Sequence, residues 1–228
     1  MKSEKLATEL SSWFPLDSSI SGPILATLHF IQDFLISSCY LVTPSLIVYC
    51  CIFLSMCFKN LSDRLKYIRQ SNLNESLRNL DKVKIRYFKL FNIAELLNKC
   101  FSVELFRIFT SNGLVCCISA YYIVTINQNL DTRISYIMKF IFMFLLMLLP
   151  ALATTSMANK AFSLFDELNQ FSFQLPREER QSVISLMLIC QNQRPTLTGW
   201  SFFDINLDLI VSITATIITY TVILVQSN

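Results

Sequence analysis

The sequence predicts an all-α membrane protein with four transmembrane helices and further helices outside the membrane. Of its 228 residues, 53% are hydrophobic and only 15% are charged, and the mean hydropathy is +0.48. Soluble domains carry about 25% charged residues. Four stretches are long and apolar enough to cross a hydrocarbon core of about 30 Å, which takes about 20 residues of helix. The segments between them show the spacing of amphipathic helices.

The four apolar stretches are the predicted transmembrane helices. Residues 34–58 and 108–126 contain no charged residue, and 209–226 contains none either. The stretch 136–158 carries one charge, Lys139, in its first turn, from where the long side chain can reach the headgroups. Soluble core helices differ from such runs because their apolar residues recur on one face only.

The positive charges assign the remaining segments to the two sides of the membrane. Ten Lys and Arg residues lie in 59–100, four lie in 159–208, and one lies in the short loop 127–135. Because short cytoplasmic loops are enriched in Lys and Arg, 59–107 and 159–208 are predicted to be cytosolic helical segments. The tail 1–33, the short loop and the C-terminus are then extracellular.

Both cytosolic segments show the periodicity of amphipathic helices, with basic residues between the apolar ones. Two arrangements are open. The helices can pack against one another as a second layer outside the membrane, which their number favours, or their basic faces can lie on anionic lipid. The apolar positions are Leu61, Leu65, Ile68, Leu73, Leu77, Leu80, Phe88, Phe91, Phe162, Phe165, Leu168, Val183, Leu186 and Ile189.

The composition excludes several classes of protein. Three glycines cannot form a Gly-rich phosphate loop, and the single histidine, His29, cannot form a histidine metal cluster. The eight cysteines lack a C-x-x-C pair, and the net charge of +3 is too small for a nucleic-acid surface. Glu104 and Arg107 are interpreted as an ion pair, and Asp204 and Asp208 as acids at a helix N-terminus. We therefore expect no enzyme, cofactor, bound metal or nucleic-acid partner.

The last apolar stretch is rich in hydroxyl groups. Uncharged polar side chains in a membrane span either hydrogen bond to neighbouring helices or line a narrow water-filled path. Thr219, Val222, Ile223 and Gln226 share one helical face. One helix cannot enclose a pore, but several symmetry-related copies can. The polar residues are Ser212, Thr214, Thr216, Thr219, Tyr220, Thr221 and Gln226.

The end of the chain resembles the closing signature of insect gustatory receptors. That signature is Thr-Tyr, five hydrophobic residues, Gln and Phe, and residues 219–226 read Thr-Tyr-Thr-Val-Ile-Leu-Val-Gln. Upstream, residues 198–205 (Thr-Gly-Trp-Ser-Phe-Phe-Asp-Ile) are similar to the family's approach to the final helix. Two positions depart from the signature, because Thr221 fills the first hydrophobic slot and Ser227 replaces the Phe. The likeness covers essentially the whole chain, as the C-terminal part of a longer receptor.

The resemblance implies a seven-helix subunit of a ligand-gated cation channel in the plasma membrane, with a role in taste perception. Such subunits assemble as homo- or heterotetramers with related receptors, and their cytosolic helix extensions form an anchor domain. The last helix lines the pore and ends outside the cell. By motif position, Gln226 is implied to contribute to ion selectivity and Tyr220 to pack this helix against its neighbours. The implied pore-lining residues are Thr219, Ile223, Gln226 and Ser227.

The implied ligand is a small-molecule tastant, which binds in a pocket that opens outward between helices. Aromatic residues near the outer ends of the spans are candidates for this pocket, namely Tyr121, Tyr122 and Tyr136. Tyrosine at a membrane interface is also an ordinary anchor, so both interpretations stay open.

Only four of the seven implied helices are present. We therefore expect a truncated gene model, a partial sequence or a decayed gene, with 1–33 as the remnant of an outer loop. The alternative function is a non-conducting four-span membrane protein that assembles or scaffolds other subunits. In that case the last helix faces lipid. A G-protein-coupled receptor would need a cytosolic C-terminus, the reverse of the side inferred from the positive charges.

Overall fold

The computed structural model describes residues 22–69, 73–125, 130–173 and 177–226. By its internal contacts the chain divides into two units, Met1–Thr43 and Pro44–Asn228. In the first unit the described residues form the beginning of helix α2. The second unit contains the rest of α2 and all later elements.

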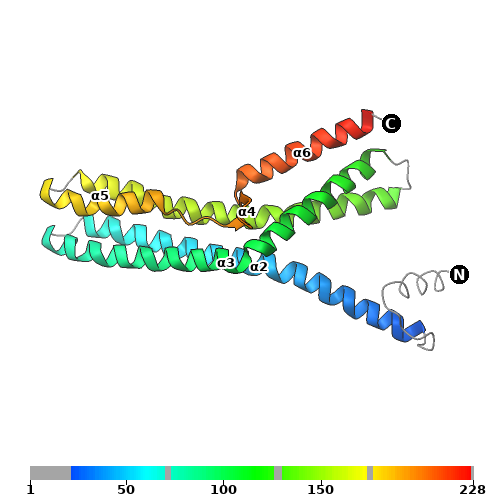
Figure 1. Ribbon diagram of the computed structural model, residues 1–228, viewed down its shortest axis with the longest axis horizontal. Helices are drawn as coiled ribbons and strands as arrows, with labels where there is room; N and C mark the ends of the chain where they lie inside the picture. Colours follow the sequence, from blue (N-terminus) through cyan, green and yellow to red (C-terminus); the bar gives the residue numbers. More distant parts are fainter. Residues whose placement is uncertain (1–21, 70–72, 126–129, 174–176, 227–228) are drawn as a thin grey trace. The chain divides into compact units, whose positions relative to one another are not determined.

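Helices account for almost all of the described chain, and two very short strands form a hairpin before the last helix (Figure 1). Four helices hold stretches long and apolar enough to cross a membrane, in agreement with the number predicted. In chain order the elements are α2 (Gly22–Arg69), α3 (Leu73–Thr125), α4 (Leu130–Ser172), α5 (Arg177–Asn192), β1 (Thr198–Gly199), β2 (Phe203–Asp204) and α6 (Leu207–Gln226).

Three of the helices are much longer than a membrane is thick. α2, α3 and α4 have 48, 53 and 43 residues, which corresponds to about 65–80 Å at 1.5 Å per residue. A hydrocarbon core takes up about 30 Å, so roughly half or more of each helix lies outside it. α6 has 20 residues, which matches one crossing.

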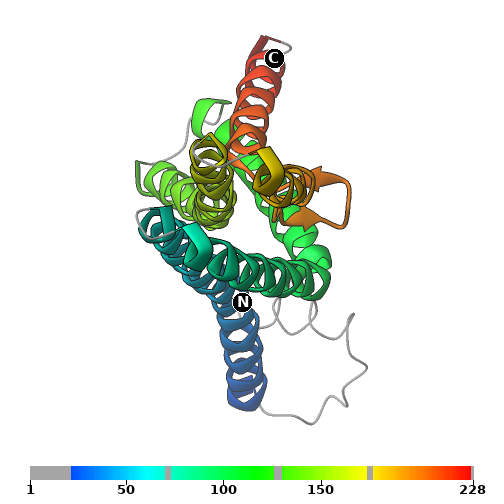
Figure 2. The ribbon, with the colours of Figure 1, turned by 90° about the vertical axis from the view of Figure 1, so that its left-hand side faces the viewer.

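The parts of the long helices farthest from α6 pack together with α5. We call this region the extension bundle: residues 58–69 of α2, 73–94 of α3, 157–172 of α4, and all of α5 (Figures 1 and 2). Its apolar side chains are buried against one another, which supports mutual packing over helices lying separately on lipid. The buried residues include Phe58, Leu61, Leu65, Leu80, Val83, Tyr87, Met157, Leu164, Leu168, Val183, Leu186 and Cys190.

Specific contacts tie the helices of the extension bundle together. The rings of Phe58 and Tyr87 meet edge-to-face with centroids 5.8 Å apart. The buried Tyr87 hydroxyl donates a hydrogen bond of 2.8 Å to the Gln193 carbonyl, just after α5. Lys66 of α2 lies 3.6 Å from the Glu167 carboxylate of α4. These interactions join α2 to α3 and to α4, and they join α3 to the residue that follows α5.

The buried face of α3 differs from the predicted one by one position. The sequence pattern placed Phe88 and Phe91 on the apolar face of the helix. Both are half-buried and Phe91 packs against the core, whereas the fully buried residues here are Val83, Tyr87 and Ala94. Continuing from Leu80, these three follow the 3.6-residue helical period more closely. The phenylalanines flank the core instead. Leu73 and Leu77 lie outside the part of the chain whose side chains are described.

A hairpin connects the extension bundle to α6. Gly199 pairs with Phe203, and Trp200 and Ser201 at the tip have φ values of 46° and 62°, in the left-handed region. The hairpin is docked on α3, because the Asn98 carboxamide oxygen accepts a hydrogen bond of 2.7 Å from the Thr198 backbone N–H. These residues are the ones that resemble the receptor family's approach to the final helix.

Candidate pore helix and tyrosine cluster

The first turn of α6 is held in place by a side chain of the preceding loop and by one of α4. Asn206 caps the helix, since its side-chain oxygen accepts a 2.8 Å hydrogen bond from the Leu209 N–H. Asp208 lies in the first turn, where a negative charge is favourable to the helix dipole, as predicted. The Leu207 N–H donates a 3.2 Å bond to the Thr155 hydroxyl of α4. α6 therefore begins level with residue 155 of α4.

The rest of α6 has few partners within the chain. Ile210 and Ile217 are its only buried residues among those described, and they face α3 and α4, the helices that α6 contacts. In the most apolar stretch of α6, 11% of the residues are buried, against 28–33% in the other three membrane-crossing helices. Most of the surface of α6 is therefore left for lipid or for other subunits.

The implied pore residues lie on this uncovered surface. Thr219, Ile223 and Gln226 share one helical face and are all exposed, with Ile223 52% exposed. Tyr220 is exposed as well. Ser227 lies outside the described residues. The structure therefore leaves the motif face free in the single chain.

The hydroxyl groups of α6 are satisfied within their own helix. Each donates to the backbone carbonyl four residues earlier, at distances of 2.7–2.9 Å. Within this chain these hydroxyl groups therefore do not donate hydrogen bonds to a neighbouring helix, which was one of the two uses predicted for them. Their oxygens can still accept hydrogen bonds from water. The residues concerned are Ser212, Thr214, Thr216, Thr219 and Thr221.

The three candidate pocket tyrosines come together at the opposite end of the membrane-crossing region from the extension bundle. Tyr122 of α3 stacks on Tyr136 of α4 with ring centroids 4.9 Å apart and an interplanar angle of 22°. Tyr121 lies against Tyr122 at 5.8 Å. All three are half-buried. We call them the tyrosine cluster. It joins the end of α3 to the beginning of α4.

Two features near the membrane-crossing region were not singled out by the sequence. Asn112 of α3 is 2% exposed, and its side-chain nitrogen has no hydrogen-bond partner in the described part of the chain. Phe106 packs against Trp200, Phe202 and Phe203 of the hairpin, with ring centroids 5.5–5.9 Å apart. Only the aromatic group had a usable sequence signal, since its three hairpin residues belong to the stretch 198–205 that resembles the receptor family.

The predicted ion pair beside this aromatic group is present. The Arg107 Nε donates a 2.9 Å hydrogen bond to Glu104 Oε2, and a second guanidinium nitrogen donates to the other carboxylate oxygen. Both side chains are partly exposed. This bidentate pair neutralises both charges near the membrane boundary.

The family of proteins described as "7tm Chemosensory receptor" matches residues 8–228. The chain therefore belongs to the 7tm chemosensory receptor family. It is a multi-pass membrane protein, and its family is one of receptors rather than of enzymes. No curated protein matches the sequence of this chain significantly.

Solved structures show the same fold. The insect olfactory receptor OR5 from Machilis hrabei in complex with eugenol superposes with a TM-score of 0.80 at 19% identity, over 95% of this chain and 56% of that one. A second structure of OR5 from Machilis hrabei gives a TM-score of 0.80 at 18% identity, over 94% of this chain and 56% of that one. The all-α membrane fold is thus confirmed, and this chemosensory receptor chain spans 56% of the length of the receptor it matches.

Proposed function

We propose that this chain is a gustatory-receptor-type subunit of a tetrameric, ligand-gated cation channel, with α6 lining the pore. The observation that carries the proposal is the uncovered motif face of α6. Thr219, Ile223 and Gln226 are exposed in the single chain although they lie in an apolar span. A face with polar groups is poorly suited to lipid, and symmetry-related copies around an axis would cover it.

The proposed orientation places the extension bundle in the cytosol and the C-terminus outside the cell. Ten of the basic residues lie between positions 59 and 100, and the positive-inside rule assigns this segment to the cytosol. Asn60 begins an Asn-Leu-Ser sequon within it. The expected result is that Asn60 carries no glycan when the chain is expressed in eukaryotic cells. Glycosylation there would reverse the proposed topology.

The proposed ligand is a small organic molecule that binds near the tyrosine cluster. The related OR5 was solved in complex with eugenol, a small aromatic compound. Stacked tyrosines offer flat apolar surface and hydroxyl groups, which suit such a ligand. Tyr122→Ala should shift the ligand dose–response to higher concentration, whereas Tyr67→Ala, far away at the end of α2, should not.

The pore assignment is tested by current recordings from cells expressing this chain, alone and with a related receptor subunit. Gln226→Ala should shift the reversal potential between two cations, because the amide at this position would contact passing ions. Leu224→Ala, two residues away on another face, is the matched control and should leave selectivity unchanged. An identical reversal potential for both variants and the unmodified chain would contradict the assignment.

A second candidate is a non-conducting assembly partner of related subunits. It is favoured by the Ser and Thr hydroxyl groups of α6, which donate within their own helix and so leave that helix suited to lipid, together with a well-packed extension bundle. In that case α6 faces lipid. Coexpression would then alter the amount of a partner receptor at the cell surface without altering its ion selectivity.

A further inference from the structure

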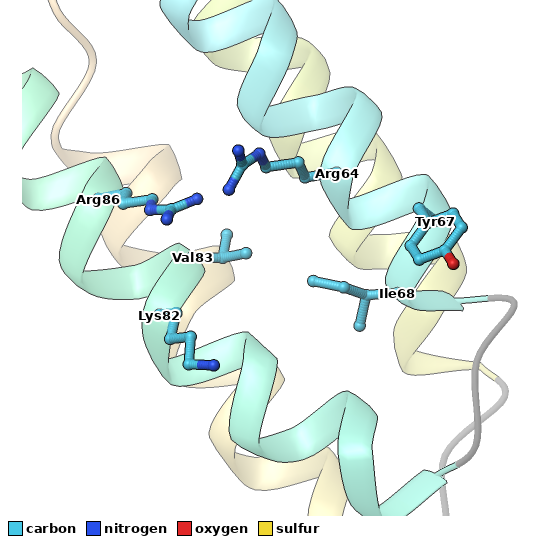
Figure 3. A pocket seen from close by; sticks show the side chains of 6 residues that line it. All are labelled: Arg64, Tyr67, Ile68, Lys82, Val83 and Arg86. Carbon is cyan, nitrogen blue, oxygen red and sulfur yellow. The ribbon is translucent and has the colours of Figure 1, made fainter.

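A groove between α2 and α3 in the extension bundle is lined by basic side chains (Figure 3). It consists of two adjoining hollows of about 330 and 320 Å³ that share Arg64 and Arg86. Lys82 lines the first hollow and Lys89 the second. Ligand pockets for small molecules begin at about 300 Å³. The groove is thus large enough for a compact organic anion.

Positive and negative charges are separated across α2. On the side toward α4, Lys66 lies 3.7 Å from Asp63 and 3.6 Å from Glu167. On the side toward α3, four bases line the groove and no acidic residue is among its lining side chains. The charges of Arg64 and Arg86 are therefore not neutralised by an acidic residue of the groove lining.

The two arginines are the centre of this charge. Figure 3 shows the Arg64 and Arg86 side chains extending toward one another from facing helices, above the apolar side chains of Ile68 and Val83. Neither guanidinium has an ion-pair or hydrogen-bond partner within the described residues. Like charges that face one another repel, and an anion placed between them relieves the repulsion.

Phosphate fits this arrangement better than a single carboxylate does. The planar guanidinium group donates two parallel hydrogen bonds to phosphate oxygens, and lysine adds a mobile point charge. Four bases distributed over two hollows match several phosphate groups, while one carboxylate carries a single charge.

The groove lies well beyond the membrane-crossing part of the chain. Cys51 of α2 contacts Thr154 of α4, next to Thr155, where α6 begins. Arg64 comes 13 residues after Cys51, which is about 20 Å farther along α2. At this distance a water-soluble compound reaches the groove, and so does a large phosphorylated headgroup that projects from the bilayer.

We propose that this groove binds an organic polyphosphate, in which two or more phosphate groups are held between Arg64 and Arg86 and by the flanking lysines. Bound there, the ligand joins α2 to α3 and stabilises the extension bundle. The two possible sources are a soluble polyphosphate and the phosphorylated headgroup of a lipid. The inference does not depend on the pore, because it concerns a different region and a different ligand.

The test measures binding to the purified full chain with one probe for each source. Inositol hexakisphosphate is titrated into the detergent-solubilised protein, and phosphatidylinositol 4,5-bisphosphate is offered in phosphatidylcholine nanodiscs, with phosphatidylserine nanodiscs for comparison. At least one phosphorylated probe should bind and raise the thermal midpoint. In Arg64→Gln/Arg86→Gln its affinity should fall about tenfold or more, because charge-assisted hydrogen bonds are lost.

The matched control carries the same loss of charge elsewhere. Lys99→Gln/Lys160→Gln also removes two positive charges, at exposed positions away from the groove, and should keep most of the affinity. Arg64→Lys/Arg86→Lys keeps the charge but loses the guanidinium geometry, and should give an intermediate affinity. Binding of the soluble probe identifies the first source, and binding of the lipid probe alone identifies the second.

Three results would overturn the proposal. One is that neither phosphorylated probe binds. Another is that the control pair weakens binding as much as the arginine pair does, which would show attraction to net charge only. The third is that phosphatidylserine competes equally, which would show a general anionic-surface effect. Current recordings play no part in these measurements, so the proposed channel function stands or falls separately.

Discussion

The extension bundle and α6 use apolar side chains in opposite ways. In the extension bundle, residues such as Leu164, Leu168 and Leu186 are fully buried against one another. In α6, which is apolar along most of its length, Ile210 and Ile217 are the only buried residues among those described. High hydropathy therefore does not predict internal packing here. The extension bundle holds the chain together, whereas most of the surface of α6 is left for lipid or for other subunits.

The difference follows from the solvent around each region. Outside the membrane, burial of apolar surface away from water stabilises the helices directly. Inside the membrane, lipid is as apolar as leucine, so that driving force between helices is missing. α6 is consequently attached by its first turn and by the hairpin. The rest of the helix is available for contacts with symmetry-related copies.

Thiol reactivity gives the largest contrast between the two regions. Burial raises the pKa of the Cys190 thiol in the extension bundle to about 12, with a smaller opposing effect of its hydrogen bond to Tyr87. An exposed thiol has a pKa of about 8.5. At pH 8, Cys190 should thus react with a water-soluble maleimide roughly a thousandfold more slowly than Ile223→Cys in α6, as measured by peptide mass spectrometry.

The pH dependence follows from the same shift. Because the raised pKa keeps Cys190 neutral, its alkylation rate should rise about tenfold per pH unit between pH 7 and 10. Ile218→Cys lies on another face of α6 and is the control for the pore assignment. If Ile223→Cys reacts no faster than Ile218→Cys, the face with Ile223 is turned toward lipid and the assembly-partner function is favoured.

Truncation of core side chains should separate the regions by stability. Leu168→Ala removes a fully buried side chain between α4 and its neighbours and should lower the free energy of unfolding by about 2–5 kcal/mol. Ile218→Ala in α6 is the matched aliphatic control, because Ile218 is 59% exposed, and it should have little effect on the isolated subunit. Both are measured by thermal unfolding in detergent. Equal losses would show that α6 contributes to the fold as the bundle does.

Much of this organisation was predictable from the sequence, because hydropathy and helical period report directly on membrane crossing and on buried faces. The four spans, the helices beyond them, and the Glu104–Arg107 pair all follow from local patterns. The fully buried face of α3 passes through Tyr87 rather than Phe88, and Phe91 packs at the edge of the core. A helical face through Tyr87 and one through Phe88 differ by a single residue in the sequence pattern. Packing against α2, where Phe58 meets Tyr87, decides between them.

Long-range juxtapositions were not predictable in the same way. Arg64 and Arg86 belong to one strongly basic segment, but nothing in their spacing shows that they face one another. That arrangement arises from the pairing of α2 with α3. The tyrosine cluster was predictable only in part. Each residue was expected near the outer end of a span, but the stacking of Tyr122 on Tyr136 depends on how α3 meets α4.

The hairpin that joins the two regions should be sensitive to small changes. A Cβ atom on Gly199 would lie 2.4 Å from the ring of Phe203, and that ring is itself packed against Phe106 and Phe109. Gly199→Ala should therefore cost about 1–3 kcal/mol by overpacking. Gly113→Ala in α3 is the control, because no atom lies within 4 Å of its Cβ position. It should stabilise the helix by about 0.5–1 kcal/mol. If Gly199→Ala leaves the free energy of unfolding unchanged, the hairpin rearranges at little cost and α6 is only loosely attached.

The smallest expected effect concerns single hydroxyl groups. Tyr87→Phe removes the 2.8 Å hydrogen bond to the Gln193 carbonyl and should lower the free energy of unfolding by about 1 kcal/mol. Tyr220→Phe in α6 removes a hydroxyl from a side chain that is 58% exposed and should leave the isolated subunit unchanged. In the assembled channel, however, Tyr220 is proposed to contact a neighbouring subunit. A loss of tetramer stability in Tyr220→Phe, without a loss in the monomer, would therefore show that α6 meets other copies as proposed.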